Sequence, residues 1–448
     1  MENPKITGVI SKNIFQKQLI KIVFFSLIII SILIHIWKIS LPAVPVFDEA
    51  YFSTFAAQNA LGEPYFDIHP PLGKLMFALP LFSEDRESLK DADFVKIFRS
   101  PTSSQIITDY KPGSYKNFPY LDLRLISVLS SLLFLSALFF FVRELAGDNI
   151  ALLAMFFATL ENALLLHTRL ILMDGMYLAL GLFGLYFFVR KYPKPILGGL
   201  LFGAALAIKL TAIALIGPAL VLWMLSGDKK TAGKNFLKFC LMSFGTLLVL
   251  WFSINTLLFP PGERLASFNE IMGTSLAPAF WTPIIMFLKD ILVSFVGYTF
   301  GGNNPMMSPW YFWPILLGTI HYDNSGMNIR LVGNIFVWYL STLAVLAAIA
   351  KFMRDGIKKI GLSEEYKPAL ILLGGYIFAL VPFFTIIRRA TFLYHYFPAL
   401  TFAIGLTAFL IIKFLENKPR KIKIAVISAI IILTIVGFLI SAPYTYGL

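Results

Sequence analysis

Long apolar segments alternate with short polar ones along most of the chain. Windows of roughly twenty apolar residues, long enough to cross a bilayer as a helix, recur along the sequence. We therefore predict an all-α polytopic membrane protein with about eleven transmembrane helices. These are expected at 19–39, 120–142, 149–167, 170–189, 196–208, 211–226, 237–259, 331–350, 368–387, 397–415 and 423–441.

The apolar stretch 196–226 is long enough to be read as a single helix. However, Lys209 lies near its centre, and an ammonium group inside a bilayer is costly. We therefore predict that the helix breaks at Lys209 and that this lysine lies at a membrane surface. The acidic residue Glu161, by contrast, falls within the predicted helix 149–167.

Basic residues indicate the orientation of the chain in the membrane. The tail before the first predicted helix carries Lys5, Lys12, Lys17 and Lys21, and cytoplasmic segments are rich in lysine and arginine. We predict a cytoplasmic N-terminus and, after eleven crossings, an external C-terminus. The first helix is expected to be a retained anchor, because no small-residue cleavage site follows it.

The composition agrees with a membrane protein. The chain has 448 residues, of which 58% are hydrophobic and 14% are charged, whereas a soluble protein carries about 25% charged residues. The net charge of +13 is explained by basic cytoplasmic loops, so no nucleic-acid partner is predicted. There is no glycine-rich nucleotide-binding motif, which argues against a soluble nucleotide as substrate.

Two long segments, 40–119 and 260–330, lie outside the cell in this topology and are expected to contain amphipathic helices. The cytoplasmic loops are short and hold no clustered polar chemistry. Neither long loop has room for an inserted soluble domain, and no internal repeat is visible. We therefore predict one membrane-embedded domain, 1–448, that acts at the extracytoplasmic face.

The first outer loop concentrates polar residues directly after the first apolar segment. Segments 47–51 and 65–74 together hold acidic residues, a histidine, a lysine and the pair Pro70-Pro71. The two prolines stiffen the chain just before an apolar run, so a rigid loop is expected to return to the membrane surface. The candidate functional side chains of this loop are Asp48, Glu49, Asp67, His69 and Lys74.

Cationic residues gather at the predicted outer ends of several helices. A single lysine or arginine at a helix end often extends toward the interface without further function. Several of them opposite acidic loops are instead suited to a lipid phosphate, and a carboxylate above them is suited to act as a general base. The pattern indicates an enzyme that transfers a group from a lipid phosphate to an external acceptor. The residues concerned are Arg124, His167, Arg169, Lys209, Arg388, Arg389 and His395, with Asp174 among them.

At these positions the chain resembles the protein O-mannosyltransferase family, whose members have the C-type membrane glycosyltransferase fold. Eukaryotic members carry a large soluble domain in the second outer loop, so this chain resembles a compact prokaryotic form. The segment 83–119 has no counterpart in the resemblance. The matching segments are 47–52, 65–74, 124–125, 167–174, 207–211, 308–314, 333–334 and 392–400.

The resemblance implies an inverting transfer of mannose from a polyprenyl-phosphate carrier to Ser/Thr hydroxyls of exported proteins. It implies that Asp48 is the general base, with Glu49 positioning it or substituting for it, because a hydroxyl needs a proton acceptor before it attacks. The remaining implied roles are acceptor shaping by Asp67, His69 and Lys74, lipid-phosphate binding by Arg124, Lys209, Arg389 and His395, and cation orientation by Asp174.

Several alternatives stay open at this point. The same fold and charges would serve a transferase of another lipid-linked sugar to a lipid or glycan. A transporter or lipid flippase is a different class, but it needs polar groups through the membrane centre, whereas these charges lie at one face. No cofactor is predicted as required, although Asp48, Glu49 and Asp67 offer the oxygen ligands that a divalent cation prefers. The oligomeric state is not indicated by the sequence.

Overall fold

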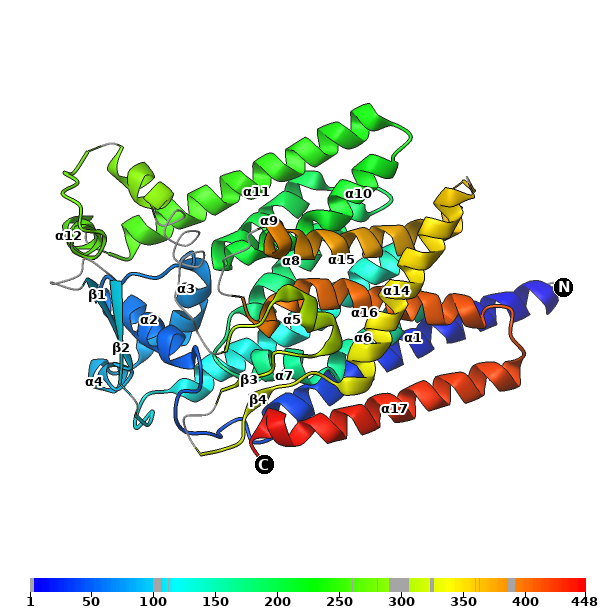
Figure 1. The fold of residues 1–448 in the computed structure, drawn as a ribbon, viewed down its shortest axis with the longest axis horizontal. Helices are drawn as coiled ribbons and strands as arrows, with labels where there is room; N and C mark the ends of the chain where they lie inside the picture. The colour runs from blue at the N-terminus through cyan, green and yellow to red at the C-terminus, as the bar shows by residue number, and fades with distance from the viewer. Residues whose placement is uncertain are drawn as a thin grey trace.

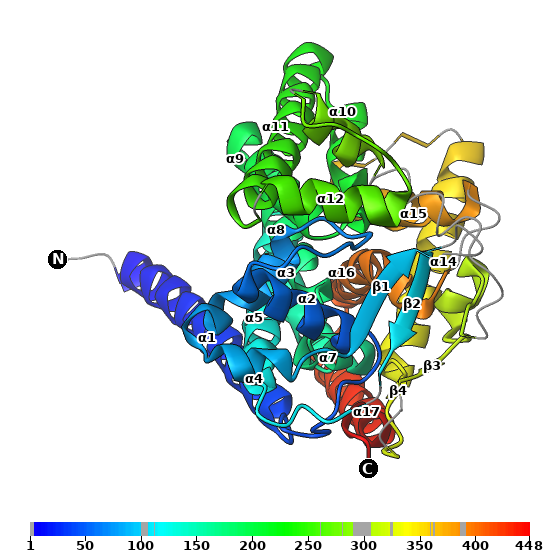
Figure 2. The ribbon, with the colours of Figure 1, turned by 90° about the vertical axis from the view of Figure 1, so that its left-hand side faces the viewer.

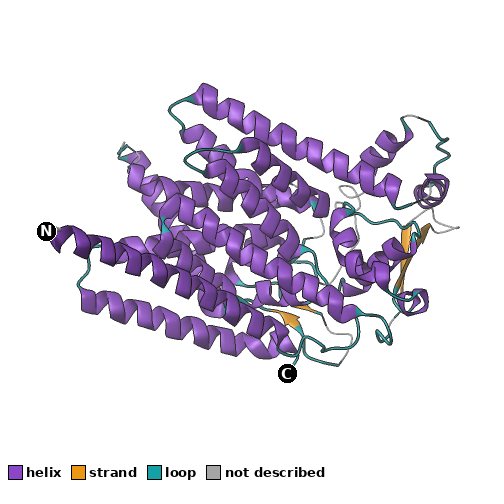
Figure 3. Ribbon diagram, turned by 180° about the vertical axis from the view of Figure 1, so that it is seen from behind, coloured by secondary structure: helices purple, strands orange, loops and turns teal. Residues whose placement is uncertain are grey.

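The computed structural model of the chain describes residues 4–99, 106–111, 113–259, 261–279, 281–289, 306–322, 326–358, 360–361, 363–385 and 391–448. Helices dominate the described residues, and the few strands lie toward one end of the molecule (Figure 3). The long helices run side by side as a bundle, and shorter elements gather at the end opposite the N-terminus (Figure 1).

Among the described residues, seven helices are long and apolar enough to cross a membrane, and one bent pair adds an eighth. Three further predicted segments coincide with shorter apolar helices, namely α8 (Asp174–Val189), α9 (Pro195–Ile208) and η2 with α10 (Leu210–Ile216 and Gly217–Leu225). Each predicted segment thus contains a helix, whereas the number of eleven crossings stays a prediction. The seven long helices are α1 (Pro4–Ile36), α5 (Tyr120–Ala146), α11 (Lys229–Leu257), α14 (Ile335–Ile357), α15 (Lys367–Thr385), α16 (Phe397–Leu415) and α17 (Arg420–Tyr446).

The segment 149–167 is not the straight helix that the sequence predicts. It consists of α6 (Asp148–Thr159) and α7 (Asn162–Arg169), which are bent by 66° relative to each other. Glu161 lies at the bend, and its buried carboxylate accepts hydrogen bonds from the backbone N–H groups of Leu164 at 2.7 Å and Asn334 at 2.8 Å. This side chain caps the start of α7, so an acid within a predicted span marks a break in it.

The predicted break at Lys209 is confirmed. Helix α9 ends at Ile208, Lys209 has an extended backbone with φ −150° and ψ 122°, and η2 begins at Leu210. Near the start of α9, at the end away from the break, α8 and α9 approach closely because two glycines face each other. A Cβ atom on Gly184 would lie 2.8 Å from the carbonyl oxygen of Gly198, and the reverse distance would be 2.7 Å. Small residues of this kind bring membrane helices together, and here they fix the helix that carries Lys209.

The described parts of the two long segments 40–119 and 260–330 cover one end of the bundle (Figures 1 and 2). We call α2 (Glu49–Leu61), α3 (Leu72–Ala78), α4 (Arg86–Lys90), α12 (Pro261–Met272) and the sheet of β1 (Val95–Arg99) and β2 (Ile106–Tyr110) the end layer. Helix α3 begins directly after the two prolines, as the rigid-loop prediction requires. The short 3-10 helices are η1 (Leu79–Ser83), η3 (Trp310–Ile315), η4 (Glu364–Tyr366) and η5 (Leu393–Tyr396).

Within the described residues, two small antiparallel sheets accompany the predominantly helical fold. In the first, Val95 pairs with Tyr110 and Arg99 pairs with Ile106. The second joins β3 (Ile320–His321) to β4 (Arg330–Leu331). The strands of the first sheet are rich in isoleucine, valine and other residues that favour extended structure. They lie in segment 83–119, for which the resemblance offered no counterpart.

Candidate active site

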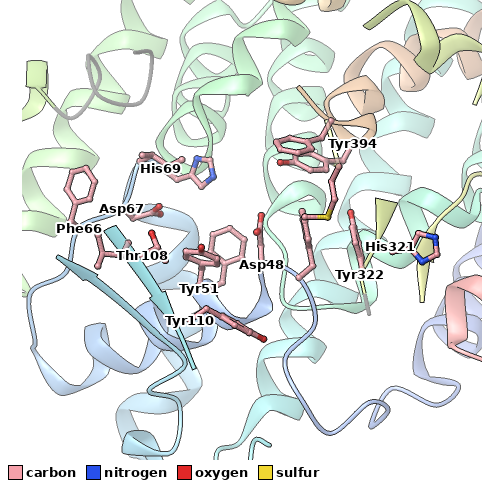
Figure 4. A pocket seen from close by; sticks show the side chains of 16 residues that line it. Asp48, Tyr51, Phe66, Asp67, His69, Thr108, Tyr110, His321, Tyr322 and Tyr394 are labelled. Carbon is pink, nitrogen blue, oxygen red and sulfur yellow. The ribbon is translucent and has the colours of Figure 1, made fainter. Parts of the chain in front are cut away.

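A cavity of about 500 Å³ opens beside the segment that contains Asp48. In Figure 4, Asp48 lies between Tyr51 and Tyr110 on one side and Tyr322 on the other. The cavity therefore combines the end layer with segments that follow α12 and α15 in the chain. Its lining comprises Phe47, Asp48, Tyr51, Phe52, Phe66, Asp67, Ile68, His69, Ile97, Thr108, Tyr110, Met306, His321, Tyr322, Phe392 and Tyr394.

Asp48 is the residue that precedes α2, and its side chain makes no capping hydrogen bond. Within the part of the chain that the structure describes, no hydrogen bond or ion pair engages its carboxylate. Burial raises the pKa of Asp48 to about 7; Lys209 opposes this shift, while the charges of Asp174 and Asp67 add to it. A carboxylate with these properties can take up a proton near neutral pH.

Glu49 is fully buried and faces Arg124 instead of the cavity. The guanidinium donates from Nε to Oε1 at 2.9 Å and from Nη2 to Oε2 at 2.8 Å. The backbone N–H groups of Val46 and Ile171 also donate to this carboxylate, at 3.1 and 2.9 Å. With four hydrogen bonds, Glu49 fixes the start of α2 against the bundle and thereby positions Asp48.

The sequence predicts that Glu49 positions Asp48 or substitutes for it, and the contacts of Glu49 suit the first of these roles. It also predicts that Arg124 binds the lipid phosphate, whereas the structure places Arg124 against Glu49. Neither residue lines the cavity, because a buried guanidinium and a buried carboxylate satisfy each other's charge. Arg124 Nη1 also donates a hydrogen bond to the carbonyl oxygen of Ile39, at 2.7 Å. Both side chains therefore act here as positioning groups.

The three residues expected on the acceptor side lie together. Asp67 and His69 line the cavity, and Lys74 is buried behind them with its ammonium 2.6 Å from Asp67 Oδ2 and 2.5 Å from the carbonyl oxygen of His69. Burial lowers the pKa of His69 to about 4, although the charge of Asp67 opposes this. The imidazole is therefore neutral at physiological pH and offers hydrogen bonding without charge.

Lys209 is held by Asp174, as the sequence predicted for an orienting acid. Asp174 Oδ1 lies 2.9 Å from Lys209 Nζ, and Asp174 Oδ2 lies 2.9 Å from His167 Nδ1. The other imidazole nitrogen is hydrogen-bonded to the hydroxyl of Tyr322. Lys209, Asp174 and His167 are thus linked to Tyr322, which lines the cavity. Tyr394 also lines the cavity, and its ring lies 5.0 Å from the ammonium of Lys209.

Two other residues, Arg389 and His395, are expected to bind the phosphate. Arg389 is outside the described residues. His395 is buried in η5, where its Nδ1 accepts a hydrogen bond from the backbone N–H of Phe392 at 3.0 Å, and its ring lies nearly parallel to that of Trp313. His395 does not line the cavity; it holds the turn that presents Tyr394, which does.

Asp48, Glu49 and Asp67, which the sequence offers as ligands for a divalent cation, do not converge on one point. Glu49 is turned to Arg124, and Asp67 is paired with Lys74. No group of three or more His, Cys, Asp or Glu side chains that could hold a metal ion occurs within the described ranges. Asp48 and Asp67 both line the cavity, and of these two Asp48 is the one without an ion-pair partner among the described residues.

Sequence reasoning missed most of the aromatic wall of the cavity. Tyr51, Tyr110 and Tyr322 carry no motif that separates them from other tyrosines of the chain. Tyr394 lies in segment 392–400, which the resemblance had marked, although only His395 was selected from it. Thr108 and His321 come from strands that were not predicted.

Replacing Asp48 by Asn is expected to stabilise the folded protein more at alkaline than at acid pH. Because its pKa is raised on folding to about 7, ionisation destabilises the folded state, and this loss of stability grows between about pH 4, where the carboxyl of the unfolded chain ionises, and about pH 7. The difference in Tm between variant and wild type, measured in detergent, should be larger at about pH 8 than at about pH 5. Asp109→Asn, an exposed neighbour on β2, is the control; equal differences at both pH values would contradict the prediction.

Comparison with solved structures identifies the fold. A chain of the S. cerevisiae protein O-mannosyltransferase Pmt1-Pmt2 complex, bound to its sugar donor, superposes with a TM-score of 0.77 at 15% identity, over 96% of this chain and 90% of that chain. The Archaeoglobus fulgidus oligosaccharyltransferase superposes with a TM-score of 0.56 at 14% identity, over 97% of this chain and 56% of that chain. The fold is therefore that of the C-type membrane glycosyltransferases.

Sequence comparison then gives the family. The model described as dolichyl-phosphate-mannose-protein mannosyltransferase matches residues 25–259, and that of the C-terminal four-helix membrane region of protein O-mannosyltransferase matches 290–448. The chain belongs to the protein O-mannosyltransferase family, since the first model alone matches more than half of it. The matched range includes segment 83–119.

Curated relatives match over shorter stretches. Dolichyl-phosphate-mannose–protein mannosyltransferase 4 of Schizosaccharomyces pombe is 30% identical over 175 residues, which are 38% of this chain and 20% of that protein. Dolichyl-phosphate-mannose–protein mannosyltransferase 5 of Candida albicans is 27% identical over 215 residues, 44% of this chain and 27% of that protein. The matches thus span about a fifth to a quarter of the length of these relatives.

Proposed function

We propose that this chain is an inverting glycosyltransferase that moves mannose from a polyprenyl-phosphate carrier to Ser/Thr hydroxyls of exported proteins at the extracytoplasmic face of the cell membrane. The observation that carries the proposal is the state of Asp48. Of the two carboxylates that line the cavity, Asp67 is paired with Lys74, whereas Asp48 has a raised pKa and no partner among the described residues. The family relatives support the choice of sugar and acceptor.

The chemistry needs one base on the acceptor side. The hydroxyl of a serine or threonine gives its proton to Asp48 as its oxygen attacks the anomeric carbon. The bond from that carbon to the carrier phosphate breaks on the opposite side, so the configuration inverts. A base whose pKa lies near the working pH accepts the proton efficiently, and a pKa of about 7 meets this condition.

The carrier side needs positive charge at the leaving phosphate. Lys209, fixed by Asp174 behind the cavity wall, is suited to stabilise the negative charge that grows there. Arg389, outside the described residues, keeps its expected role as a second cation. Tyr322 and Tyr394 line the cavity together with Asp48, and the ring of Tyr394 lies 5.0 Å from the ammonium of Lys209. Ring faces at this place suit the apolar side of a sugar.

The proposal is tested by adding polyprenyl-phosphate-mannose and a Ser/Thr peptide to membranes that contain the protein. Mass spectrometry should detect peptide-bound hexose, and NMR of the product should show the anomeric configuration opposite to that of the donor. Transfer from another lipid-linked sugar, with none from the mannose donor, would favour the same-fold alternative. Movement of a labelled lipid across the membrane without any transfer would favour a flippase.

Replacing Asp67 by Asn is expected to extend activity to lower pH. The charge of Asp67 contributes to the raised pKa of Asp48, so its removal lowers that pKa and leaves Asp48 ionised in more acid solution. The acid limb of the kcat/KM profile should therefore move to lower pH. Asp109→Asn, which changes an exposed carboxylate of β2 outside the cavity lining, should leave the limb in place; a shift to higher pH in Asp67→Asn would refute this reasoning.

A further inference from the structure

Tyr322 has two contacts that point to a role of its own. It is 2% exposed and lines the cavity together with Asp48. Its ring stacks on that of Phe47, with centroids 4.2 Å apart and planes at 7°, and its hydroxyl is hydrogen-bonded to His167 Nε2. The side chain is thereby fixed in both ring plane and hydroxyl position, on the wall that Figure 4 shows opposite Tyr51.

The partners of His167 determine which atom of Tyr322 carries the donor hydrogen. Asp174 is ionised because it is paired with Lys209, so it can only accept, and His167 Nδ1 must carry a proton. The single cation Lys209 already balances Asp174, and a second buried positive charge would have no counter-charge. We therefore assign a neutral imidazole whose Nε2 is an acceptor.

It follows that the Tyr322 hydroxyl donates its hydrogen to His167. The hydrogen is directed away from the cavity, and the oxygen keeps acceptor capacity for a second partner. An acceptor fixed in a cavity wall selects a ligand that carries a donor, and a hydroxyl group is the donor that a sugar offers in abundance.

We propose that the Tyr322 hydroxyl oxygen accepts a hydrogen bond from one hydroxyl of the transferred sugar and so helps to determine which sugar is used. This proposal rests on the proposed function, because it assigns a contact within the same cavity. His167 is then a positioning residue, which orients the Tyr322 hydroxyl without touching the sugar. Asp174 keeps the imidazole in the required tautomer.

The test compares wild-type protein with Tyr322→Phe on a mannose donor and on donors that lack one hydroxyl at a time. The variant keeps the ring that stacks on Phe47 but loses the hydroxyl. We expect a roughly two- to thirteenfold lower kcat/KM on the mannose donor, the range typical of one hydrogen bond. On one particular deoxy donor the variant and the wild type should be equally active.

A fluorinated donor at that same position separates the two possible hydrogen-bond directions. Fluorine can accept but not donate, so the wild type should lose its advantage over Tyr322→Phe with this donor. If the advantage persists, Tyr322 donates to the sugar and the proposal is overturned. It is also overturned if Tyr322→Phe loses the same factor with every deoxy donor, since that result indicates a structural role.

Two controls keep these results interpretable. Tyr339→Phe makes the same chemical change at an exposed residue outside the cavity lining, whose hydroxyl donates to the carbonyl of Ile315, and it should match the wild type on every donor. If the wild type transfers a lipid-linked sugar other than mannose, the proposed function is wrong about the donor sugar. The same comparison is then made with deoxy forms of the sugar that is transferred, and the role of Tyr322 stands or falls on that result.

Discussion

Replacing Asp48 by Asn is expected to lower the rate of mannose transfer by roughly two to four orders of magnitude. The amide is nearly the same size as the carboxylate but cannot take up the proton of the acceptor hydroxyl. No other carboxylate of the neighbourhood is placed to replace it among the described residues, because Glu49 is occupied by Arg124 and Asp67 by Lys74. The loss should therefore not be rescued from within the cavity.

The measurement is the initial rate of transfer to a Ser/Thr peptide at saturating donor. The reduction should be in kcat, with KM for the lipid donor little changed, because Asp48 acts on the acceptor side. Asp109→Asn provides the matched change outside the cavity lining. A variant at Asp48 that keeps more than about a tenth of the wild-type rate would rule out this carboxylate as the base.

Replacing Arg124 by Ala is expected to destabilise the protein by about 3–5 kcal/mol. Arg124 and Glu49 are both fully buried, so removal of the guanidinium leaves a carboxylate charge inside the protein without its partner. The start of α2 then loses its attachment to α5, and Asp48 loses its position. Transfer activity should fall together with stability, although Arg124 does not line the cavity.

Chemical unfolding in detergent provides the test, with Arg143→Ala as its control. Arg143 pairs with Asp148 at 2.6 Å, but half of its side chain is exposed, and such surface pairs contribute at most about 1 kcal/mol. The double variant Glu49→Leu/Arg124→Leu should recover part of the stability, because it removes both charges. Equal losses in Arg124→Ala and Arg143→Ala would contradict a structural role for the buried pair.

The sequence predicted the helical segments well because apolar length is a local property. It also led to Asp48, since an acidic pair beside a membrane is unusual enough to be noticed. The pairing of charges could not be predicted in the same way. Glu49 and Arg124 are 75 residues apart, and which cation meets which acid is decided by the packing of α2 against α5.

The cavity walls were the least predictable part of the site. Tyr110 lies on a strand in the segment without a recognised counterpart, and Tyr322 is one aromatic among many in a long loop. These two tyrosines become part of the site because the folded chain brings them to the cavity beside Asp48. Glu161 shows the opposite case, because an acidic residue in an apolar segment is easily noticed in the sequence. Its role, which is to cap the helix that begins at the bend between α6 and α7, becomes clear only in the structure.

The acid and the cation of this site belong to different parts of the molecule. Asp48 stands at the start of the end layer, whereas Lys209 lies between two bundle helices. The buried pair of Glu49 and Arg124 ties these parts together. Under the proposed function, mutations in the end layer are therefore expected to change which polypeptides are modified while carrier binding is preserved, and the reverse is also expected. A chain organised in this way can acquire new acceptors and new donors along separate evolutionary routes.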